Sequence, residues 1–337
     1  MPSLNESLNE FRQDLVSGDW VLFSTLRAKR PRGEKEQESP AYKSKEGCPF
    51  EDPVKSGQEI IWSYPNEKDW KVTVINNKYP AVKQGICGPG WKTGPFNVFD
   101  ASGIHNIIIF KNHDIHLADF TNEQGAEVIK VYKRRHQEIA SSGGCIDYVM
   151  IFHNSGRRAG ASIYHPHSQI ISTPILPPDV SRSFFGSLKF YQEHKKRVYD
   201  LIIDWEREQK KRIVYENDNF IAFCPFVSKL PYEVRIFSKE SHAHFERMPD
   251  ELDSDLADVL LISLKKIRKV LDDPPYNFFI HTAPVETFPE KIHEFYSWHI
   301  EILPKLSISA GFELGTGIDI NVVDPDRAAE ELRNANV

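Results

Sequence analysis

Two stretches of the chain repeat the same order of hydrophobic and polar positions. Residues 103–120 and residues 230–248 each begin with an apolar run typical of a strand, continue through a lysine and histidines, and lead into an acidic helical stretch. A looser similarity links residues 72–82 with residues 219–231. This repetition predicts an internal duplication, although strand, turn and helix in that order also recur by chance.

A helix is predicted after the repeated strands in each half. Residues 121–143 and 250–273 carry apolar side chains near a 3.6-residue period, and each helix gives way through glycine or proline to further strands. Each half therefore has the order strand, strand, helix, strand, strand, which favours antiparallel sheet over alternating βα units. We expect an α+β fold of two such halves, with antiparallel sheets and packed helices.

The two halves divide the chain near its middle. Residues 184–217 have the pattern of one charged amphipathic helix that connects them, and residues 29–47 have the Lys, Glu, Ser and Pro content of an exposed loop. The predicted domains are residues 1–183, which carry a histidine-rich segment, and residues 184–337, which begin with the connector. With 337 residues in all, the chain is long enough for a substantial core.

Composition removes several classes of function. The net charge of -6 lacks the basic character of a general nucleic-acid binder, and no apolar run approaches the about 18 residues that span a membrane. The polar N-terminus lacks the apolar stretch of a secretion signal, and the four cysteines show no pattern of a disulfide framework. We therefore expect a cytoplasmic protein that binds neither nucleic acid nor membrane.

Three polar side chains are in phase within the histidine-rich segment. His165, His167 and Gln169 are spaced two residues apart, so in an extended chain they project from one face. Small residues just before them allow backbone N–H groups to approach a phosphate closely. These residues are Gly156, Gly160 and Ser162. The segment therefore combines a phosphate-binding loop with a row of side chains that can do chemistry.

His167 is the predicted nucleophile of this row. A neutral imidazole attacks phosphorus well when its other ring nitrogen is held as a hydrogen-bond donor. Gln169 can donate amide hydrogens to a phosphoryl oxygen but cannot act as an acid or base toward water, so it favours transfer over hydrolysis. The alternative is that the histidines are metal ligands or polar strand residues without a catalytic role.

The motif H-P-H-S-Q, preceded by N-x-x-x-x-x-G-A-S, resembles the galactose-1-phosphate uridylyltransferase family of the histidine-triad superfamily. Residues 14–31 and 310–321 are similar to the beginning of that family and to the ending of its bacterial and plant members. The resemblance implies two histidine-triad-like halves, with His167 receiving a nucleotidyl group and Gln169 steadying the phosphoryl group. It also implies substrate contacts by Arg27, Arg30, Asn77, Asn154 and Ser162.

The resemblance further implies a structural zinc ion. The matching ligand positions are Cys48, Glu51, His113 and His165. Glu51 replaces the second cysteine of the family pattern, and one thiolate, one carboxylate and two imidazoles remain an acceptable tetrahedral set. A second family metal site is not expected to be filled, because Ser297 stands where a histidine would accompany His281 and His299.

The leading functional prediction is a hexose-1-phosphate nucleotidyltransferase. It would pass a nucleoside monophosphate between a nucleotide sugar and a sugar phosphate through His167. Within the family the alternative is a phosphorylase of the ADP-glucose type, whose acceptor is inorganic phosphate. Outside it, the alternative is a non-catalytic nucleotide-sugar sensor. Family members are commonly dimers, so the resemblance also implies a homodimer.

Overall fold

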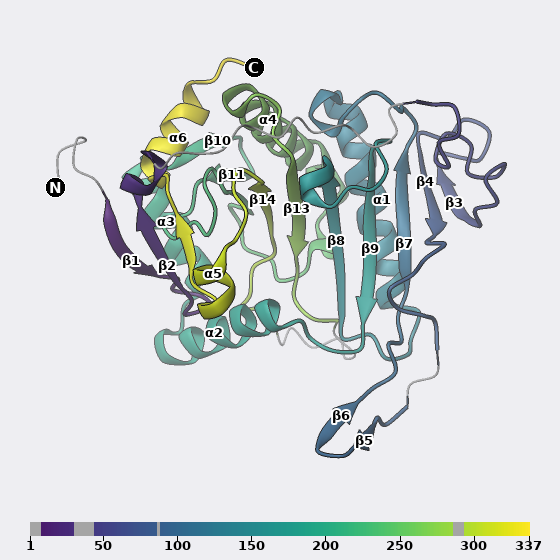
Figure 1. Ribbon diagram of the computed structural model, residues 1–337, viewed down its shortest axis with the longest axis horizontal. Helices are drawn as coiled ribbons and strands as arrows, with labels where there is room; N and C mark the ends of the chain where they lie inside the picture. The colour runs from purple at the N-terminus through teal and green to yellow at the C-terminus, as the bar shows by residue number, and fades with distance from the viewer. Residues whose placement is uncertain (1–7, 30–43, 86–87, 286–292) are drawn as a thin grey trace.

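A 10-stranded sheet runs across the whole protein (Figure 1). The computed structural model describes residues 8–29, 44–85, 88–285 and 293–337. In sheet order the strands are β10 (Ile213–Glu216), β11 (Phe220–Phe223), β12 (Val234–Ser238), β14 (His299–Pro304), β13 (Tyr276–His281), β8 (Tyr148–Ser155), β9 (His167–Thr173), β7 (His105–Phe110), β4 (Val72–Asn76) and β3 (Ile60–Tyr64). Every neighbouring pair in this sheet is antiparallel.

The strand order shows the duplication directly. The sequence β3, β4, β7, β9, β8 on one side is matched from the other side by β10, β11, β12, β14, β13, so every strand has a counterpart at the same distance from the middle. Strands β8 and β13 meet at the centre, where Phe152 pairs with Phe279. Helix α1 (Asn122–Ala140) precedes β8 as helix α4 (Asp253–Leu271) precedes β13. The predicted α+β class and internal duplication are confirmed.

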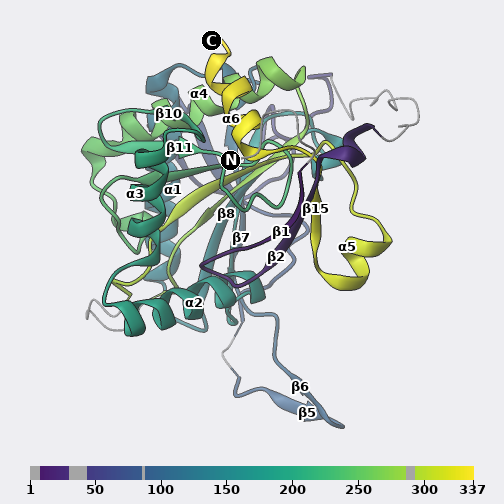
Figure 2. The same ribbon diagram turned by 90° about the vertical axis from the view of Figure 1, so that its left-hand side faces the viewer.

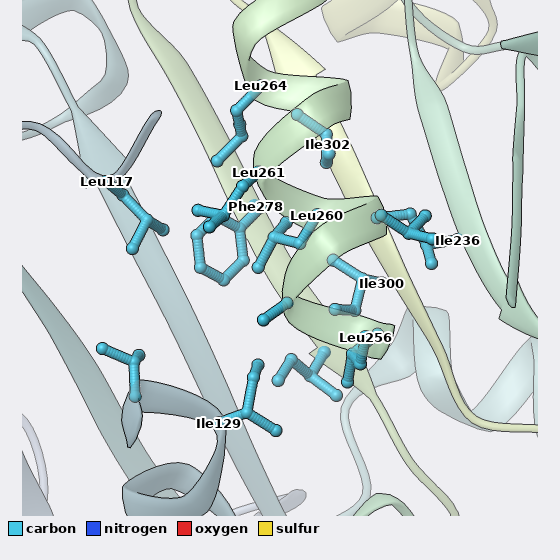
Figure 3. Packing of buried hydrophobic residues seen from close by; sticks show 14 of the residues in the cluster. Leu117, Ile129, Ile236, Leu256, Leu260, Leu261, Leu264, Phe278, Ile300 and Ile302 are labelled. Carbon is cyan, nitrogen blue, oxygen red and sulfur yellow. The ribbon is translucent and has the colours of Figure 1, made fainter. Parts of the chain in front are cut away.

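Helices α1 and α4 lie together on one face of the sheet and form the main core with it. Helix α1 begins with the Thr121 capping box, in which Thr121 and Gln124 exchange hydrogen bonds. Gly125 allows the two helices to approach, because a Cβ atom there would lie 2.9 Å from Leu261 Cδ1. Figure 3 shows side chains of α4 that include Leu260 packing onto the sheet around Phe278.

The opposite face of the sheet is covered in two separate places. Helices α2 (Pro178–His194) and α3 (Val198–Gln209) pack over the second half, where Tyr199 contacts Phe237. A smaller cluster around Cys48 and Phe50 covers the first half. Side chains of the central strands between these covers stay half-buried, and they include Phe152, Gln169 and Phe279. This region of the sheet is therefore accessible to a ligand.

The connector between the halves differs from the prediction. Residues 184–217 are not one helix, because α2 ends at His194, Lys195 adopts a left-handed conformation with φ 55, and α3 begins at Val198. The basic residues from His194 to Arg197 offer no apolar side chain to continue the packed face. The predicted boundary between residues 183 and 184 lies inside α2, and the division into two domains stays a prediction.

The N- and C-terminal segments meet in a small second sheet. It contains β1 (Asn9–Gln13), β2 (Trp20–Ser24) and β15 (Asp319–Asn321), and β15 pairs parallel with β2. Helices α5 (Gly311–Thr316) and α6 (Pro325–Asn334) flank β15 in the chain. The hairpin of β5 (Trp91–Thr93) and β6 (Phe96–Val98) projects away from the body in both Figure 1 and Figure 2.

Two findings bear on the compositional predictions. None of the helices in the described part of the chain combines the length and the apolar character that a membrane span needs. Cys145 is disulfide-bonded, whereas Cys48 and Cys224 are free thiols. The disulfide bond of Cys145 was not predicted, because spacing along the chain does not show which cysteines meet in space. Most of the predicted loop at residues 29–47 lies outside the described residues.

Candidate active site

His167 is the first residue of β9, and the backbone orients its ring. A carbonyl oxygen can only accept, so Nδ1–H donates to the carbonyl of His165 at 2.9 Å and the lone pair of the neutral ring lies on Nε2. The side chain is 7% exposed, and its ring meets that of Phe50 edge-on at 5.0 Å between centroids. Burial lowers the pKa of His167 to about 4. The imidazole is therefore neutral near neutral pH, as a nucleophile must be.

Gln169 lies on the same face of the sheet as His167. Strand β7 places Ile109 opposite His167 and Ile107 opposite Gln169, so both side chains of β9 project to one side. Gln169 Oε1 is 2.9 Å from Nε2 of His105, the first residue of β7. His105 carries no signal of its own in the sequence, because only the pairing of β7 with β9 brings it beside Gln169.

Asn77 joins the same cluster from the end of β4. Its Nδ2 lies 3.2 Å from His105 Nε2, and its Oδ1 accepts the backbone N–H of Tyr79. The predicted nucleotide contact Asn77 and the predicted phosphoryl contact Gln169 therefore border a single imidazole ring.

The loop between β8 and β9 turns tightly on two glycines. Gly156 (φ 82) and Gly160 (φ 90) flank a short 3₁₀ helix, η3 (Arg157–Ala159). A Cβ atom at Gly156 would lie 2.8 Å from Pro275 Cβ, so only glycine fits this close approach. The loop predicted for phosphate binding is thus pressed against the second half of the chain.

Asn154 is held by a residue from that second half. Nδ2 of Asn277, on β13, donates to Asn154 Oδ1 at 2.8 Å and to the carbonyl of Ala159 at 2.7 Å. Asn277 was not found by sequence reasoning, since it lies more than a hundred positions from the motif and carries no signal of its own. It connects the central seam of the sheet to the glycine loop.

A cavity of about 1410 Å³ lies beside this loop. Three arginines from two segments line it, a charge pattern that suits phosphate groups: Arg27 from η1 (Thr25–Lys29), with Arg157 and Arg158 from η3. Asn154 and His165 also line it, and Ser162 lies exposed between two lining residues, Ala161 and Ile163. His167 and Gln169 follow His165 and Pro166 in the chain but are not among the residues that line this cavity. Arg30 lies outside the described residues.

The predicted metal ligands converge on one point. Cys48 Sγ lies 3.7 Å and His113 Nδ1 3.2 Å from His165 Nδ1, and the three side chains form a group able to hold a metal ion. Glu51 Oε2 lies 3.3 Å from His113 Nδ1 and 3.6 Å from His165 Nδ1. Donor atoms around a tetrahedral zinc are roughly 3.3–3.8 Å apart, given Zn–N near 2.0 Å and Zn–S near 2.3 Å. The residues present therefore fit a metal ion.

His165 connects the predicted metal ligands to the predicted nucleophile His167. Its Nε2–H donates to the carbonyl of Phe110 at 2.6 Å, which directs the lone pair of Nδ1 into the cluster. Its own carbonyl accepts the Nδ1–H of His167. A metal ion bound here would thus stabilise the backbone group that orients the His167 ring.

A second group of possible ligands forms in the other half. His281, His299 and Glu301 lie together, but Arg235 Nε lies 2.9 Å from Glu301 Oε1. A guanidinium beside the carboxylate opposes a second cation. The expectation that this group holds no metal stays a prediction.

Comparison with known proteins agrees with the fold. The family model described as galactose-1-phosphate uridyl transferase, N-terminal domain, matches residues 3–177, and a model for a domain of unknown function (DUF4921) matches residues 99–335. ADP-glucose phosphorylase from Arabidopsis thaliana is 32% identical over 342 residues, which cover 99% of this chain and 95% of the relative. Galactose-1-phosphate uridylyltransferase from Thermotoga maritima is 29% identical over 337 residues, 97% of this chain and 99% of that one.

Solved structures give the same result. A crystal structure of an ADP-glucose phosphorylase from Arabidopsis thaliana with bound ADP-glucose has a TM-score of 0.83 at 31% identity and covers 98% of this chain and 99% of its own. A uridylyltransferase structure has a TM-score of 0.73 at 27% identity, with 96% and 97% covered. The chain is therefore an enzyme of the nucleotidyltransferase class. It belongs to the galactose-1-phosphate uridylyltransferase family.

Proposed function

We propose that this enzyme moves a nucleoside monophosphate from a nucleotide sugar to a second phosphate compound through a covalent adduct on His167. Nε2 attacks the α-phosphorus, an N–P bond forms, and the bond to the bridging oxygen breaks, so that the sugar 1-phosphate leaves with the electron pair. An oxygen of the acceptor phosphate then attacks the same phosphorus and the N–P bond breaks. The hydrogen bond from Nδ1–H to the His165 carbonyl carries this proposal, because it leaves Nε2 unprotonated and available.

The residues around His167 are proposed to stabilise the charge that develops on the phosphoryl oxygens. Gln169 and Asn154 supply amide N–H donors, Ser162 supplies a hydroxyl, and the loop glycines supply backbone N–H groups. Arg27 and Arg30 offset the charge of the diphosphate. Asn77 contacts the nucleotide portion.

We propose a hexose 1-phosphate as the acceptor, as the name of the Thermotoga relative implies. Inorganic phosphate is a second candidate, because ADP-glucose phosphorylase has the higher identity of these two relatives, 32% against 29%. Both acceptors present a phosphate oxygen to the same phosphorus, so the site chemistry is shared. Uridine and adenosine are correspondingly the two candidate nucleosides.

We also propose that Cys48, Glu51, His113 and His165 hold zinc. The ion would cross-link three segments of the chain close to His167.

A homodimer is proposed as well, because the C-terminal segment exposes apolar side chains, Ile308 at 80% and Leu314 at 77%. Light scattering should then give twice the 38.8 kDa of one chain. A monomeric mass at micromolar concentration contradicts the dimer.

Trapping of the adduct tests the proposed function. UDP-glucose and ADP-glucose, each labelled at the α-phosphorus, should leave an acid-labile label on the denatured protein, and the faster of the two identifies the nucleoside. Adding galactose 1-phosphate or inorganic phosphate to the labelled enzyme should release the label, and the faster release identifies the acceptor. Binding of both nucleotide sugars without any labelling means that the protein is a sensor and not a transferase.

A further inference from the structure

Two amide side chains at the site are each held by their oxygen atom. Gln169 Oε1 contacts His105 on β7, and Asn154 Oδ1 contacts Asn277 on β13. We infer that His105 and Asn277 are positioning residues that turn the NH₂ groups of these amides toward bound phosphate. This inference rests on the proposed function, since it assigns the cause of a geometry that the transfer reaction uses.

The tautomer of His105 follows from its backbone partner. The N–H of Ala81 donates to His105 Nδ1 at 3.1 Å, so Nδ1 accepts and the proton of the neutral ring lies on Nε2. That Nε2–H can only donate, and the atom opposite it at 2.9 Å is therefore Gln169 Oε1 and not the amide nitrogen. A reversed Gln169 amide would place two donors against each other and leave a group unsatisfied.

Asn77 is a second neighbour of His105 Nε2 and does not itself decide the tautomer. Its Oδ1 accepts the N–H of Tyr79, so its Nδ2 is the atom 3.2 Å from His105 Nε2. Because His105 Nε2 already carries a proton, it cannot accept a hydrogen from Asn77. The amide hydrogens of Asn77 therefore need an acceptor from outside this cluster, which a nucleotide supplies.

Asn277 is oriented by two acceptors at once. The two oxygens that contact its Nδ2 belong to Asn154 and to the carbonyl of Ala159, and neither distance exceeds 2.8 Å. The backbone carbonyl of Ala159 can only accept, which fixes the nitrogen of Asn277 on this side and makes Oδ1 the partner atom of Asn154. The NH₂ group of Asn154 is then the end left for a ligand.

The two contacts together give the site a consistent polarity. Phosphoryl oxygens accept hydrogen bonds, so a surface that offers N–H groups stabilises their charge, whereas a reversed amide would oppose oxygen to oxygen. Removing a whole donor from an oxyanion site costs about 100-fold to 1,000-fold in rate. Freeing an amide to rotate while it stays in place should cost less, about tenfold.

A double-mutant cycle tests His105. His105→Phe should slow adduct formation with labelled nucleotide sugar about tenfold in the natural protein and have almost no effect in a Gln169→Ala background. His105→Gln, whose amide can donate to Gln169 Oε1, should restore part of the rate. Ser172→Ala serves as the control, because it removes a hydrogen bond to the backbone of Ile104, next to His105, and does not touch Gln169. Equal slowing in both backgrounds would show a merely structural role and overturn the inference for His105.

The matching cycle for the second pair uses Asn277→Asp. This substitution keeps the shape and replaces the donor by an acceptor, so it should reverse Asn154 and slow adduct formation about tenfold, with no further loss in an Asn154→Ala background. Asn219→Asp is the control, because Asn219 Nδ2 also donates to an oxygen, that of Asp255, away from the loop. Loss of equal size in the Asn154→Ala background overturns the inference for Asn277.

Failure of the positioning inference and failure of the proposed function give different experimental results. If the natural protein forms the adduct and neither pair shows coupling, the positioning inference fails and the transfer proposal stands. If no adduct forms, the same cycles measured on the Kd of the nucleotide sugar still show whether each pair is coupled. Thermal unfolding of every variant identifies those that fail to fold.

Discussion

Strands β9 and β14 occupy equivalent places in the two halves, and each carries a histidine whose ring is held in the same way. His167 Nδ1 lies 2.9 Å from the carbonyl of His165, and His299 Nδ1 lies 3.1 Å from the carbonyl of Ser297. In both cases the acceptor is the backbone two residues earlier. The orientation of the ring is therefore common to both halves and does not distinguish the proposed nucleophile His167 from His299.

The two strands differ in the side chain that lies two residues after each histidine. Gln169 is a neutral amide opposite Ile107, whereas Glu301 is a carboxylate opposite Arg235. Although burial raises it, the Arg235 guanidinium holds the pKa of Glu301 well below its ordinary value. The second half therefore presents carboxylate oxygens, which only accept hydrogen bonds, where the first presents amide N–H donors, and a phosphoryl oxygen finds no donor on Glu301.

The two histidines also differ in access. His299 stacks between Phe237 at 4.9 Å and His281 at 5.0 Å, and Tyr199 of α3 lies 5.6 Å away. The ring of His167 contacts that of Phe50, which belongs to the smaller cluster over the first half. The preceding residue, Pro166, lines the large cavity. An uncharged amide and a more open sheet face therefore distinguish the half that carries His167 from the half that carries His299.

Removing each histidine is the strongest way to break the comparison. His167→Ala should abolish labelling and lower transfer at least about a thousandfold, because no other group can form the adduct. His299→Ala should leave labelling per folded molecule unchanged. Quantified adduct on both variants checks this, and comparable labelling of the two would mean that the halves are not functionally distinct.

Arg235 tests what the second half contributes to stability. Arg235→Met leaves Glu233 and Glu301 buried without their cation, and it should lower the free energy of unfolding by about 3–5 kcal/mol. Urea unfolding measures this loss, while the rate of adduct formation per folded molecule should stay the same. A stable variant with lost activity would place Arg235 in the reaction instead.

Gln169→His tests whether hydrolysis is limited because the glutamine amide, unlike an imidazole, cannot transfer a proton. An imidazole at this position can pass a proton to the oxygen that attacks or leaves, so hydrolysis of the adduct should rise about tenfold relative to transfer. The ratio of hydrolysis to transfer is measured from the amounts of labelled nucleoside monophosphate and of labelled product formed with the acceptor. An unchanged partition removes the explanation offered for the glutamine.

The metal clusters provide the smallest expected effect on chemistry. Cys48→Ser should lower the zinc content of the purified protein and the midpoint of thermal unfolding, because the thiolate is the softest of the four donors. His281→Ala should leave the zinc content unchanged. Elemental analysis decides, and a natural protein without zinc under metal-replete conditions contradicts the four-ligand site.

The features found from sequence are those with a local signal. The spacing of His167 and Gln169 placed both on one face of β9, whereas His165 lies before the strand begins. The 3.6-residue periods located α1 and α4 within a few residues. His105 and Asn277 were missed because their partners depend on strand register, which joins positions far apart in the chain. The break at Lys195 was missed because apolar positions recur on both sides of the basic run from His194 to Arg197, and the two stretches were assigned to one helix.

The central seam also decides what a fragment of this chain would do. If residues 1–183 were expressed alone, β8 would become an edge strand with a row of unpaired backbone N–H and C=O groups, as the partner that covers it is β13. A second copy of the fragment could occupy that edge with Phe152 against Phe152, and the ten-stranded sheet would then re-form with two reactive histidines. Separating the halves at this seam would thus expose an unpaired strand edge on each of them.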